Sequence, residues 1–496
     1  MQHHRVGLSE YVLFALLIGL AGLSLVMFIS QIIAPQTLLV AGLVIDRLSA
    51  AIALLVASVG VVVFRFSLRY LDGEPGQVRF LHWLFLTILA AYLLMIAANL
   101  LLLFAAWAMA STGLHNLLTF YQNRAEALRP ARKKFLISRL GDIVLLSAIF
   151  LIWNQWGTLN LYTFLEQVNE PATWAAAPSV VAMLIVVAAL TKSAQFPFHS
   201  WLPETMESPT PVSALMHAGI INAGGVLVLR FAPLLVVVPA ALFNLALVGT
   251  ITTVLGLLAM WSQTNIKRTL AWSTVSQMGF MMIQIGLAAF PAALLHIVGH
   301  GFYKAWSFLR TGDLPPSTPA TAPLAPALAL VLLLVGVVVA VPAILLASMI
   351  TGFDPLHSPG ELALTAIVAL AMGHVWIAFF RARPATGSNA LAAAGGALLT
   401  TFLAVSGAFA LYTGALLYLA PVMGTLPIPT DPLSWAAAVL PVVALTALSI
   451  VHAVLPALAT TPGGRAFYVH ALHGFYFGAL ADQLVEQVWK TTRATA

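Results

Sequence analysis

Apolar runs long enough to cross a lipid bilayer recur along almost the whole chain, and no other feature constrains the fold as strongly. A transmembrane helix needs roughly 20 apolar residues. Such runs lie near 11–33, 43–65, 80–98, 99–121, 135–153, 178–198, 211–231, 240–262, 269–288, 291–310, 325–350, 361–380, 390–418 and 431–458. The chain is therefore predicted to be an all-α polytopic membrane protein with about 14 transmembrane helices, the third and fourth separated by a turn at Ala97–Asn99.

The composition agrees with this and excludes several functional classes. Hydrophobic residues make up 61% of the chain and charged residues only 8%, whereas soluble domains carry about 25% charged residues. The absence of cysteine excludes disulfides, iron–sulfur clusters and cysteine nucleophiles. No polar segment is long enough for a catalytic or nucleotide-binding domain. We expect no cofactor in this chain, no nucleic-acid partner and no enzyme activity of the chain alone.

Basic residues follow a pattern that predicts the orientation in the membrane. The lysines and arginines at 65–79, 124–139 and 267–268, together with Arg310 and Arg381, all fall on even-numbered connections between the predicted spans. Cytoplasmic loops of membrane proteins are enriched in these residues. We therefore expect a multi-pass protein of the bacterial inner membrane with both termini in the cytoplasm. The first apolar run, up to about residue 33, is too long for a signal peptide.

The chain is expected to divide into a transmembrane bundle over 1–460 and a cytoplasmic tail over 461–496. Residues 463–490 mix aromatic, small and charged side chains. This mixture predicts an interfacial amphipathic helix. A docking segment for a partner protein is the alternative.

Lys192 is the first candidate for chemistry inside the membrane. It ends a long apolar run and precedes Pro197 and Pro203. Proline interrupts the helical hydrogen-bond ladder, and freed backbone groups at membrane depth are tolerated only beside protein or a water cavity. A lysine at such a break can relay protons, because burial favours its neutral form. The alternative is a lysine whose ammonium group extends to the interface.

Histidines and a second lysine extend this pattern. His217 follows two prolines at a predicted helix start, and histidine titrates near neutral pH. His296, His300 and Lys304 are spaced i, i+4, i+8, so they share one face of one helix. Such a row can pass protons through intervening water. The alternatives are a lone histidine that bonds a neighbouring helix and a metal site on the histidine pair, which Lys304 disfavours because it repels cations.

Several residues are accessory candidates. Asp142 can pair with Arg139 at spacing i, i+3 on a helix surface, which is also the plain structural interpretation. Asp354 follows the eleventh predicted span and is expected at the interface. The remaining accessory candidates are His199, Glu204 and Lys267.

Two long blocks of sequence carry a family resemblance. Residues 190–231 and 264–313 resemble the signature of the antiporter-like subunits of respiratory complex I and of multisubunit sodium/proton antiporters. The resemblance extends over about 46–313. It implies two inverted repeats with broken helices, roughly 80–262 and 265–420. It also implies a proton path in which Lys192 is the broken-helix lysine, His217 follows it, and the row His296, His300 and Lys304 links two half-channels.

The sequence also departs from the family pattern. Ala108 stands where the family has a glutamate after tryptophan, the partner of the broken-helix lysine. The second broken helix is expected within 340–355, where the family's charged residue corresponds to a position near Thr351; no charge appears before Asp354.

Within that family the chain is most similar to the membrane subunit of dissolved-inorganic-carbon accumulating complexes. That resemblance implies a large cytoplasmic partner similar to a β-carbonic anhydrase, which would hold the zinc, while this chain conducts protons or sodium ions to drive carbon dioxide or bicarbonate accumulation. One alternative is a proton-pumping or Na⁺/H⁺ antiporter-like subunit of a complex I (NADH:quinone oxidoreductase-type), hydrogenase or Mrp assembly. Another is a membrane anchor without transport.

Overall fold

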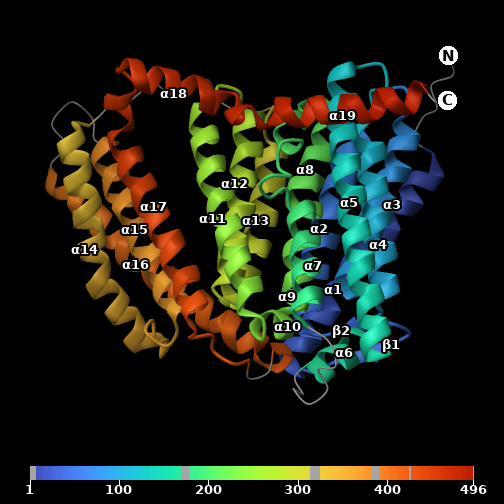
Figure 1. The fold of residues 1–496 in the computed structure, drawn as a ribbon, viewed down its shortest axis with the longest axis horizontal. Helices are drawn as coiled ribbons and strands as arrows, with labels where there is room; N and C mark the ends of the chain where they lie inside the picture. The colour runs from blue at the N-terminus through green and yellow to red at the C-terminus, as the bar shows by residue number, and fades with distance from the viewer. Residues whose placement is uncertain (1–6, 169–177, 313–323, 383–389, 424–425, 495–496) are drawn as a thin grey trace.

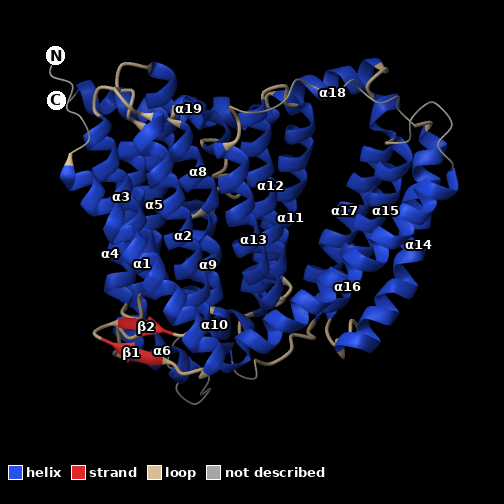
Figure 2. Ribbon diagram, turned by 180° about the vertical axis from the view of Figure 1, so that it is seen from behind, coloured by secondary structure: helices blue, strands red, loops and turns tan. Residues whose placement is uncertain are grey.

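The computed structural model describes residues 7–168, 178–312, 324–382, 390–423 and 426–494. Within them the chain is a bundle of long helices with one small β-hairpin (Figures 1 and 2). The C-terminal helices α18 and α19 cross one end of the bundle, and the hairpin lies at the other end. We call these the tail end and the hairpin end.

The elements follow one another in chain order. The first part contains α1 (Leu8–Ile33), β1 (Leu38–Val40), β2 (Leu43–Ile45), α2 (Arg47–Tyr70), α3 (Gln77–Ile96), α4 (Leu100–Leu118), α5 (Ala125–Trp156), α6 (Leu161–Val168) and α7 (Pro178–Lys192). The middle contains η2 (Leu202–Glu207), α8 (Thr210–Ala218), η3 (Ile220–Asn222), α9 (Ala223–Arg230), α10 (Ala232–Val236), α11 (Pro239–Ser262), α12 (Ile266–Gly286) and α13 (Phe290–Leu309). The last part contains α14 (Pro326–Thr351), α15 (Pro359–Arg381), α16 (Ala390–Met423), α17 (Pro432–Leu458), α18 (Pro462–Leu472), η4 (Gly474–Tyr476) and α19 (Phe477–Ala494).

Eleven helical segments of the described residues are long and apolar enough to span a membrane. The polytopic all-helical fold is therefore confirmed, whereas the exact count of fourteen spans is not. α7 is short because it stops at Lys192. α12 and α13 are not among the eleven segments, and both carry polar residues along their length. The boundaries of the inverted repeats and of the tail domain stay predictions.

Local sequence explains where α4 begins. The predicted turn at Ala97–Asn99 is confirmed, because α3 ends at Ile96 and α4 begins at Leu100. The Asn99 side chain accepts hydrogen bonds from the amides of Leu101 and Leu102, at 2.9 and 3.1 Å. It thereby satisfies amide groups that have no partner within the helix.

The break after Lys192 is present, but the second expected break is not. The chain leaves the helix at Lys192 and passes through a non-helical turn and the short η2 before α8 begins. In contrast, α14 continues through Pro342 to Thr351 and ends at Gly352, which has a left-handed backbone conformation. The prediction of a broken helix in this stretch was therefore wrong for the described residues. Proline is tolerated inside transmembrane helices when neighbouring groups satisfy the freed carbonyl.

The last helices form a group beside the rest of the bundle, and α16 ties the two parts together. α14, α15, α16 and α17 lie side by side in both ribbon views (Figures 1 and 2). Near its C-terminal end α16 reaches α2, where Tyr418 donates to the carbonyl of Arg47 at 2.8 Å and Arg47 donates to the carbonyl of Leu417 at 2.9 Å. A cavity lies between these two parts and belongs to the candidate site.

The tail packs against connections that carry the predicted basic clusters. Lys133 of α5 contacts Asp482 of α19, and Gln263 after α11 donates to the carbonyl of Leu472 in α18. Both connections therefore lie at the tail end, which agrees with the expected clustering of basic residues on one side.

Candidate functional site

Lys192 is buried at the end of α7 and is held by α4. Its ammonium group donates to the carbonyl of Trp107 at 2.9 Å and to the hydroxyl of Ser111 at 2.6 Å. It also lies 4.2 Å from the centre of the Trp107 ring. Among the described residues, no carboxylate lies within ion-pair distance of Lys192. Lys192 is therefore held by neutral acceptors and an aromatic ring. Within the part of the chain that the structure describes, it lacks the ion pair that would keep its ammonium group charged.

Asp142 reaches this lysine indirectly. The indole of Trp107 donates to Asp142 at 3.1 Å, and Arg139 forms an ion pair with the same carboxylate at 2.7 Å. The expected Arg139–Asp142 pair is thus present. It is not only a surface pair, because Asp142 is buried and bonded to the tryptophan on which Lys192 rests. Ala108, where the family has glutamate, is only half-buried beside the fully buried Trp107.

A second lysine, Lys134, belongs to this site, although the sequence pattern placed it among the basic residues of a connection between two spans. Lys134 of α5 is buried and donates to the carbonyl of Ser111 at 2.6 Å. Lys134 and Lys192 line the same cavity of about 10 Å³, which also reaches Met216 next to His217. A cavity of this size holds about one water molecule. Nothing in the sequence distinguished Lys134 from its solvated neighbours.

His217 lies at the centre of the bundle. Its ring is fully buried and stacks on Phe308 of α13, with the ring centres 4.3 Å apart. Neither ring nitrogen has a hydrogen-bond partner in the structure. His300 and Lys304 are close enough to interact with it electrostatically. The plain interpretation, a histidine bonded to a neighbouring helix, therefore does not describe this position.

The row on α13 is continuous in space. The ring centres of His296 and His300 are 5.7 Å apart, and Lys304, fully buried, donates to the carbonyl of Leu270 at 3.0 Å. His296 is hydrogen-bonded to the side-chain oxygen of Gln284 at 3.0 Å. Gln284 was missed from the sequence, since it lies on α12 and only the packing of the two helices brings it to the row.

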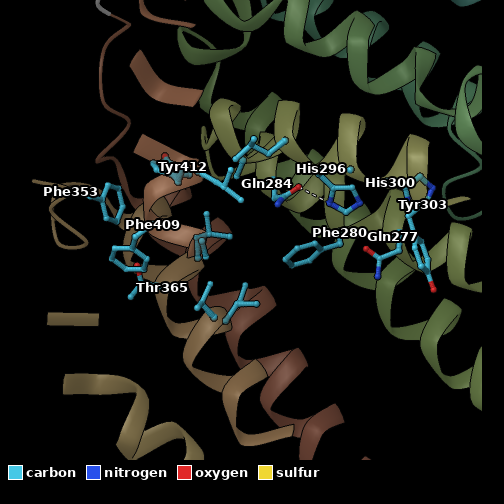
Figure 3. A pocket seen from close by; sticks show the side chains of 18 of the residues that line it. Gln277, Phe280, Gln284, His296, His300, Tyr303, Phe353, Thr365, Phe409 and Tyr412 are labelled. Carbon is cyan, nitrogen blue, oxygen red and sulfur yellow. Dashed lines mark hydrogen bonds between the residues drawn. The ribbon is translucent and has the colours of Figure 1, made fainter. Parts of the chain in front are cut away.

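The two histidines of the row line a cavity of about 620 Å³ between α12–α13 and the group α14–α16. Figure 3 shows His296 beside Gln284 on one wall, and Phe353, Phe409 and Tyr412 on the other. The row therefore ends in a space that is wide enough for a chain of water molecules.

A carboxylate that the sequence did not single out lies beyond this cavity. Tyr412 of α16 donates to Glu361 of α15 at 3.2 Å. Tyr412 lines the 620 Å³ cavity and also a second cavity of about 410 Å³, which Glu361, His357 and Val236 line as well. Val236 belongs to α10, at the hairpin end (Figure 1). The Tyr412–Glu361 pair thus separates the row from the hairpin end.

The structure does not bring all accessory candidates to this path. Asp354 is exposed and accepts from the amide of Leu356 at 2.9 Å, so it shapes a turn. Lys267 donates to Thr210 at the start of α8, at 3.0 Å. His199 and Glu204 lie together near the tail and line a cavity of about 190 Å³.

A buried ion pair at the hairpin end was also missed. Asp46 caps α2 and pairs with Arg230 of α9 at 2.5 Å. The hydroxyl of Tyr162 also donates to Asp46. Arg230 donates further to the carbonyl of Met95 at 3.1 Å. These bonds join α2, α3, α6 and α9, which gives the cluster a structural role.

Models of known protein families match the region of the chain that contains Lys192, His217 and the α13 row. A family model described as "NADH:quinone oxidoreductase/Mrp antiporter, TM" matches residues 97–315, and one described as "NADH-Ubiquinone oxidoreductase (complex I), chain 5 N-terminus" matches residues 36–81. Together they cover more than half of the chain.

Curated relatives point to the same group. The chain is 45% identical over 277 residues to the probable inorganic carbon transporter subunit DabB2 of Halothiobacillus neapolitanus, covering 56% of this chain and 50% of that protein. It is 41% identical to the probable inorganic carbon transporter subunit DabB of Hydrogenovibrio crunogenus, covering 54% and 52%. It is 36% identical to NADH-quinone oxidoreductase subunit L of Mycobacterium tuberculosis, covering 55% and 43%. The chain spans about half the length of the curated relatives it matches.

Solved structures show the same fold. The Mrp complex from Dietzia sp. matches with a TM-score of 0.54 at 24% identity, over 98% of this chain and 56% of that one. The archaeal membrane-bound sulfane sulfur reductase matches with a TM-score of 0.54 at 18% identity, over 96% and 94%.

Proposed function

The chain belongs to the antiporter-like membrane subunits of the complex I and Mrp antiporter family, and from that membership we propose that it conducts protons across a bacterial inner membrane to drive inorganic carbon accumulation. The observation that carries the proposal is the row of titratable groups on α13, in which Lys304 and His300 are buried and His296 opens into a cavity. Buried ionisable groups in a membrane are costly, so their retention in a row indicates ion movement.

The proposed route has two halves joined at His217. On the tail side, Lys192 and Lys134 share the small cavity that reaches Met216. On the hairpin side, Lys304, His300 and His296 lead to the large cavity, and the Tyr412–Glu361 pair leads from there to the second cavity. Lysine and histidine exchange protons but do not bind sodium, which favours protons over sodium ions.

The coupling to carbon rests on the relatives. The proteins at 45% and 41% identity are named probable inorganic carbon transporter subunits. In this proposal a large cytoplasmic partner similar to a β-carbonic anhydrase binds the tail end and holds the zinc, and proton flow through this chain makes the hydration of carbon dioxide one-way. The tail end faces the cytoplasm, in accordance with the positive-inside rule.

A second candidate is a proton-pumping or antiporter-like subunit of a complex I or Mrp-type assembly. The 36% identity to NADH-quinone oxidoreductase subunit L favours it. The two candidates differ in what the gradient drives, so a carbon-dependent phenotype separates them.

The test is growth in ambient air of a bacterium that lacks carbonic anhydrase, expressing this chain together with a candidate partner similar to a β-carbonic anhydrase. We expect the wild type to rescue growth, and an uncoupler and Lys192→Ala to abolish the rescue. Arg310→Gln, at the end of α13 and outside the row, serves as the matched control. Rescue by Lys192→Ala at normal membrane levels would favour an anchor without transport, and no rescue by the wild type would favour the second candidate.

A further inference from the structure

A cavity at the tail end is built jointly by the broken-helix turn and the C-terminal segment. It has a volume of about 190 Å³. One wall carries His199, Ser200 and Glu204; Leu472, His473, Gly474 and Gly478 of the tail form the opposite wall, and Gln263, Arg268 and Trp272 complete the lining. The matched family region ends at residue 315, so the tail wall lies outside the part of the chain that the family models describe.

Two polar atoms in this cavity have no hydrogen-bond partner among the residues that the structure describes. The Nδ1 atom of His199 and the hydroxyl of Ser200 are both buried and unbonded, in residues that are 2% and 4% exposed. Buried polar groups are almost always satisfied by protein or by ordered water. The cavity is therefore suited to hold water rather than apolar groups.

The next residue connects this cavity to Lys192. His199 and Ser200 face the tail cavity, whereas Trp201 lines the small cavity that contains Lys192 and Lys134. The indole nitrogen of Trp201 is buried without a partner. Consecutive residues of the broken-helix turn thus line the tail cavity and the lysine cavity.

A buried lysine fastens the tail over the cavity. The ammonium group of Lys133, 1% exposed, lies 2.7 Å from Glu204 and 3.0 Å from Asp482 of α19. It also donates to the carbonyl of Gly478 at 3.1 Å. The Phe477 ring packs against His199, with the ring centres 5.8 Å apart. The tail therefore seats through charge and aromatic contacts at the cavity itself.

The two tail glycines permit this close approach. A Cβ atom at Gly478 would lie 2.4 Å from Glu204 Oε1. Gly474 has a φ of +58°, and a Cβ atom there would lie 2.6 Å from the Trp272 ring. A side chain at Gly474 would push the tail away from the cavity, whereas one at Gly478 would displace the Glu204 carboxylate.

The carboxyl group at the cavity is also suited to exchange protons. Burial raises the pKa of Glu204, opposed by the adjacent Lys133. Burial, reinforced by Lys133, lowers the pKa of His199 to about 4. Glu204 therefore changes its charge more readily near neutral pH than an exposed glutamate does.

We propose that this cavity is the mouth through which protons reach Lys192 and that the C-terminal helices α18 and α19 are its lid, closed when Asp482 is paired with Lys133. The inference rests on the proposed proton conduction. A partner that lifts α19 would open the mouth, so partner binding and proton flow would be linked through one ion pair.

The test uses the absence of native cysteines. Ser200→Cys, in the full chain in proteoliposomes, is labelled with a charged, membrane-impermeant thiol reagent from the tail side, and proton flux is measured on the same sample before and after labelling. With the lid closed, labelling should be slow. Adding Asp482→Asn removes a charged contact that favours the closed lid over the open lid by roughly a factor of ten or more. Labelling should therefore be about tenfold faster. Glu486→Gln is the control, since Glu486 pairs with Arg129 only at the surface, at 3.9 Å.

Each outcome decides the proposal. Faster labelling in Asp482→Asn but not in Glu486→Gln, with flux lost on labelling, supports the mouth and the lid. Equal labelling rates in all three proteins overturn the lid. Complete labelling with undiminished flux overturns the mouth. If the protein that carries Ser200→Cys with Asp482→Asn, in which the lid is open, has no flux before labelling, proton conduction itself fails, and the labelling rates still decide whether the tail covers the cavity.

Discussion

The ammonium group of Lys192 rests on the face of Trp107 and bonds to the carbonyl of that same residue, at 2.9 Å. Trp107 in turn donates its indole hydrogen to Asp142. One tryptophan thus positions the lysine and connects it to the nearest carboxylate, on another helix, where the family pattern would place a glutamate beside the tryptophan.

The first prediction distinguishes a proton relay from a fixed positive charge. Lys192→Arg keeps the charge, but arginine does not release a proton in proteins. We expect proton flux to fall about 100-fold, as when a proton-transfer group is removed, and to fall equally in Lys192→Met. Flux in proteoliposomes with a pH-sensitive dye measures this. Normal flux in Lys192→Arg would mean that only the charge matters.

The second prediction concerns the connection from Lys192 to Asp142. Trp107→Phe keeps an aromatic face but removes the hydrogen bond to Asp142, a charge-assisted bond of about 1.5–3 kcal/mol. We expect flux to fall roughly tenfold, and Trp107→Leu to lower it further because the aromatic face is lost as well. Equal flux in the phenylalanine variant and the wild type would show that Asp142 does not act through Trp107.

The third prediction tests the route to the hairpin end. Glu361→Gln removes the carboxyl group that lines the second cavity and accepts from Tyr412, and we expect flux to fall by about 100-fold. Tyr412→Phe should lower flux less, since the carboxylate remains. The control is Asp354→Asn, which alters an exposed turn before the same helix. An equal loss in the control would indicate a folding defect at this end of the bundle.

The fourth prediction concerns stability. Asp46→Asn keeps the helix cap but leaves Arg230 buried without its counter-charge, which costs about 3–5 kcal/mol. Asp431→Asn makes the same change at the cap of α17, where the aspartate accepts from Leu433 and Ser434. Because asparagine caps as well as aspartate does, this control should be nearly neutral. Thermal unfolding in detergent measures both, and equal shifts would exclude a stabilising role for the ion pair.

The fifth prediction is a pH dependence of tail seating. His199 lies outside the spanning helices, and burial together with Lys133 lowers its pKa from 6.5 to about 4. The seated state therefore binds fewer protons between these values, so seating is strongest above about pH 6.5 and weakens as pH falls towards 4. The change is at most about 3 kcal/mol.

The other charged groups at the cavity are Glu204, Arg268 and His473, with Asp482 beyond Lys133. The labelling rate of Ser200→Cys between pH 7 and 5, divided at each pH by that of an exposed cysteine because only the thiolate reacts, measures tail seating, and His199→Gln should flatten the profile. A rate that does not change with pH in the parent protein would contradict the assignment to His199.

Sequence patterns predicted the parts of the site that lie along one helix. The spacing of His296, His300 and Lys304 fixed their common face, and the prolines after Lys192 predicted the break. Contacts between helices were not predictable. Lys134 stood in a basic cluster that had the composition of a solvated loop, and only the packing of α5 against α4 buries it.

The second half of the path was harder to predict for the same reason. Pro342 suggested a break in α14, but the helix continues through this residue to Thr351. The pairing of Glu361 with Tyr412 depends on the register between α15 and α16, which a single sequence does not contain.

Tyr412 forms part of the wall of two cavities at once. On the proposed proton route, the Tyr412 ring is therefore part of the insulation between the two cavities. The rate at which protons leak through the resting protein would then depend on how often the Tyr412 ring rotates. A side-chain rotation that moves no helix could therefore set how much of the proton gradient is lost.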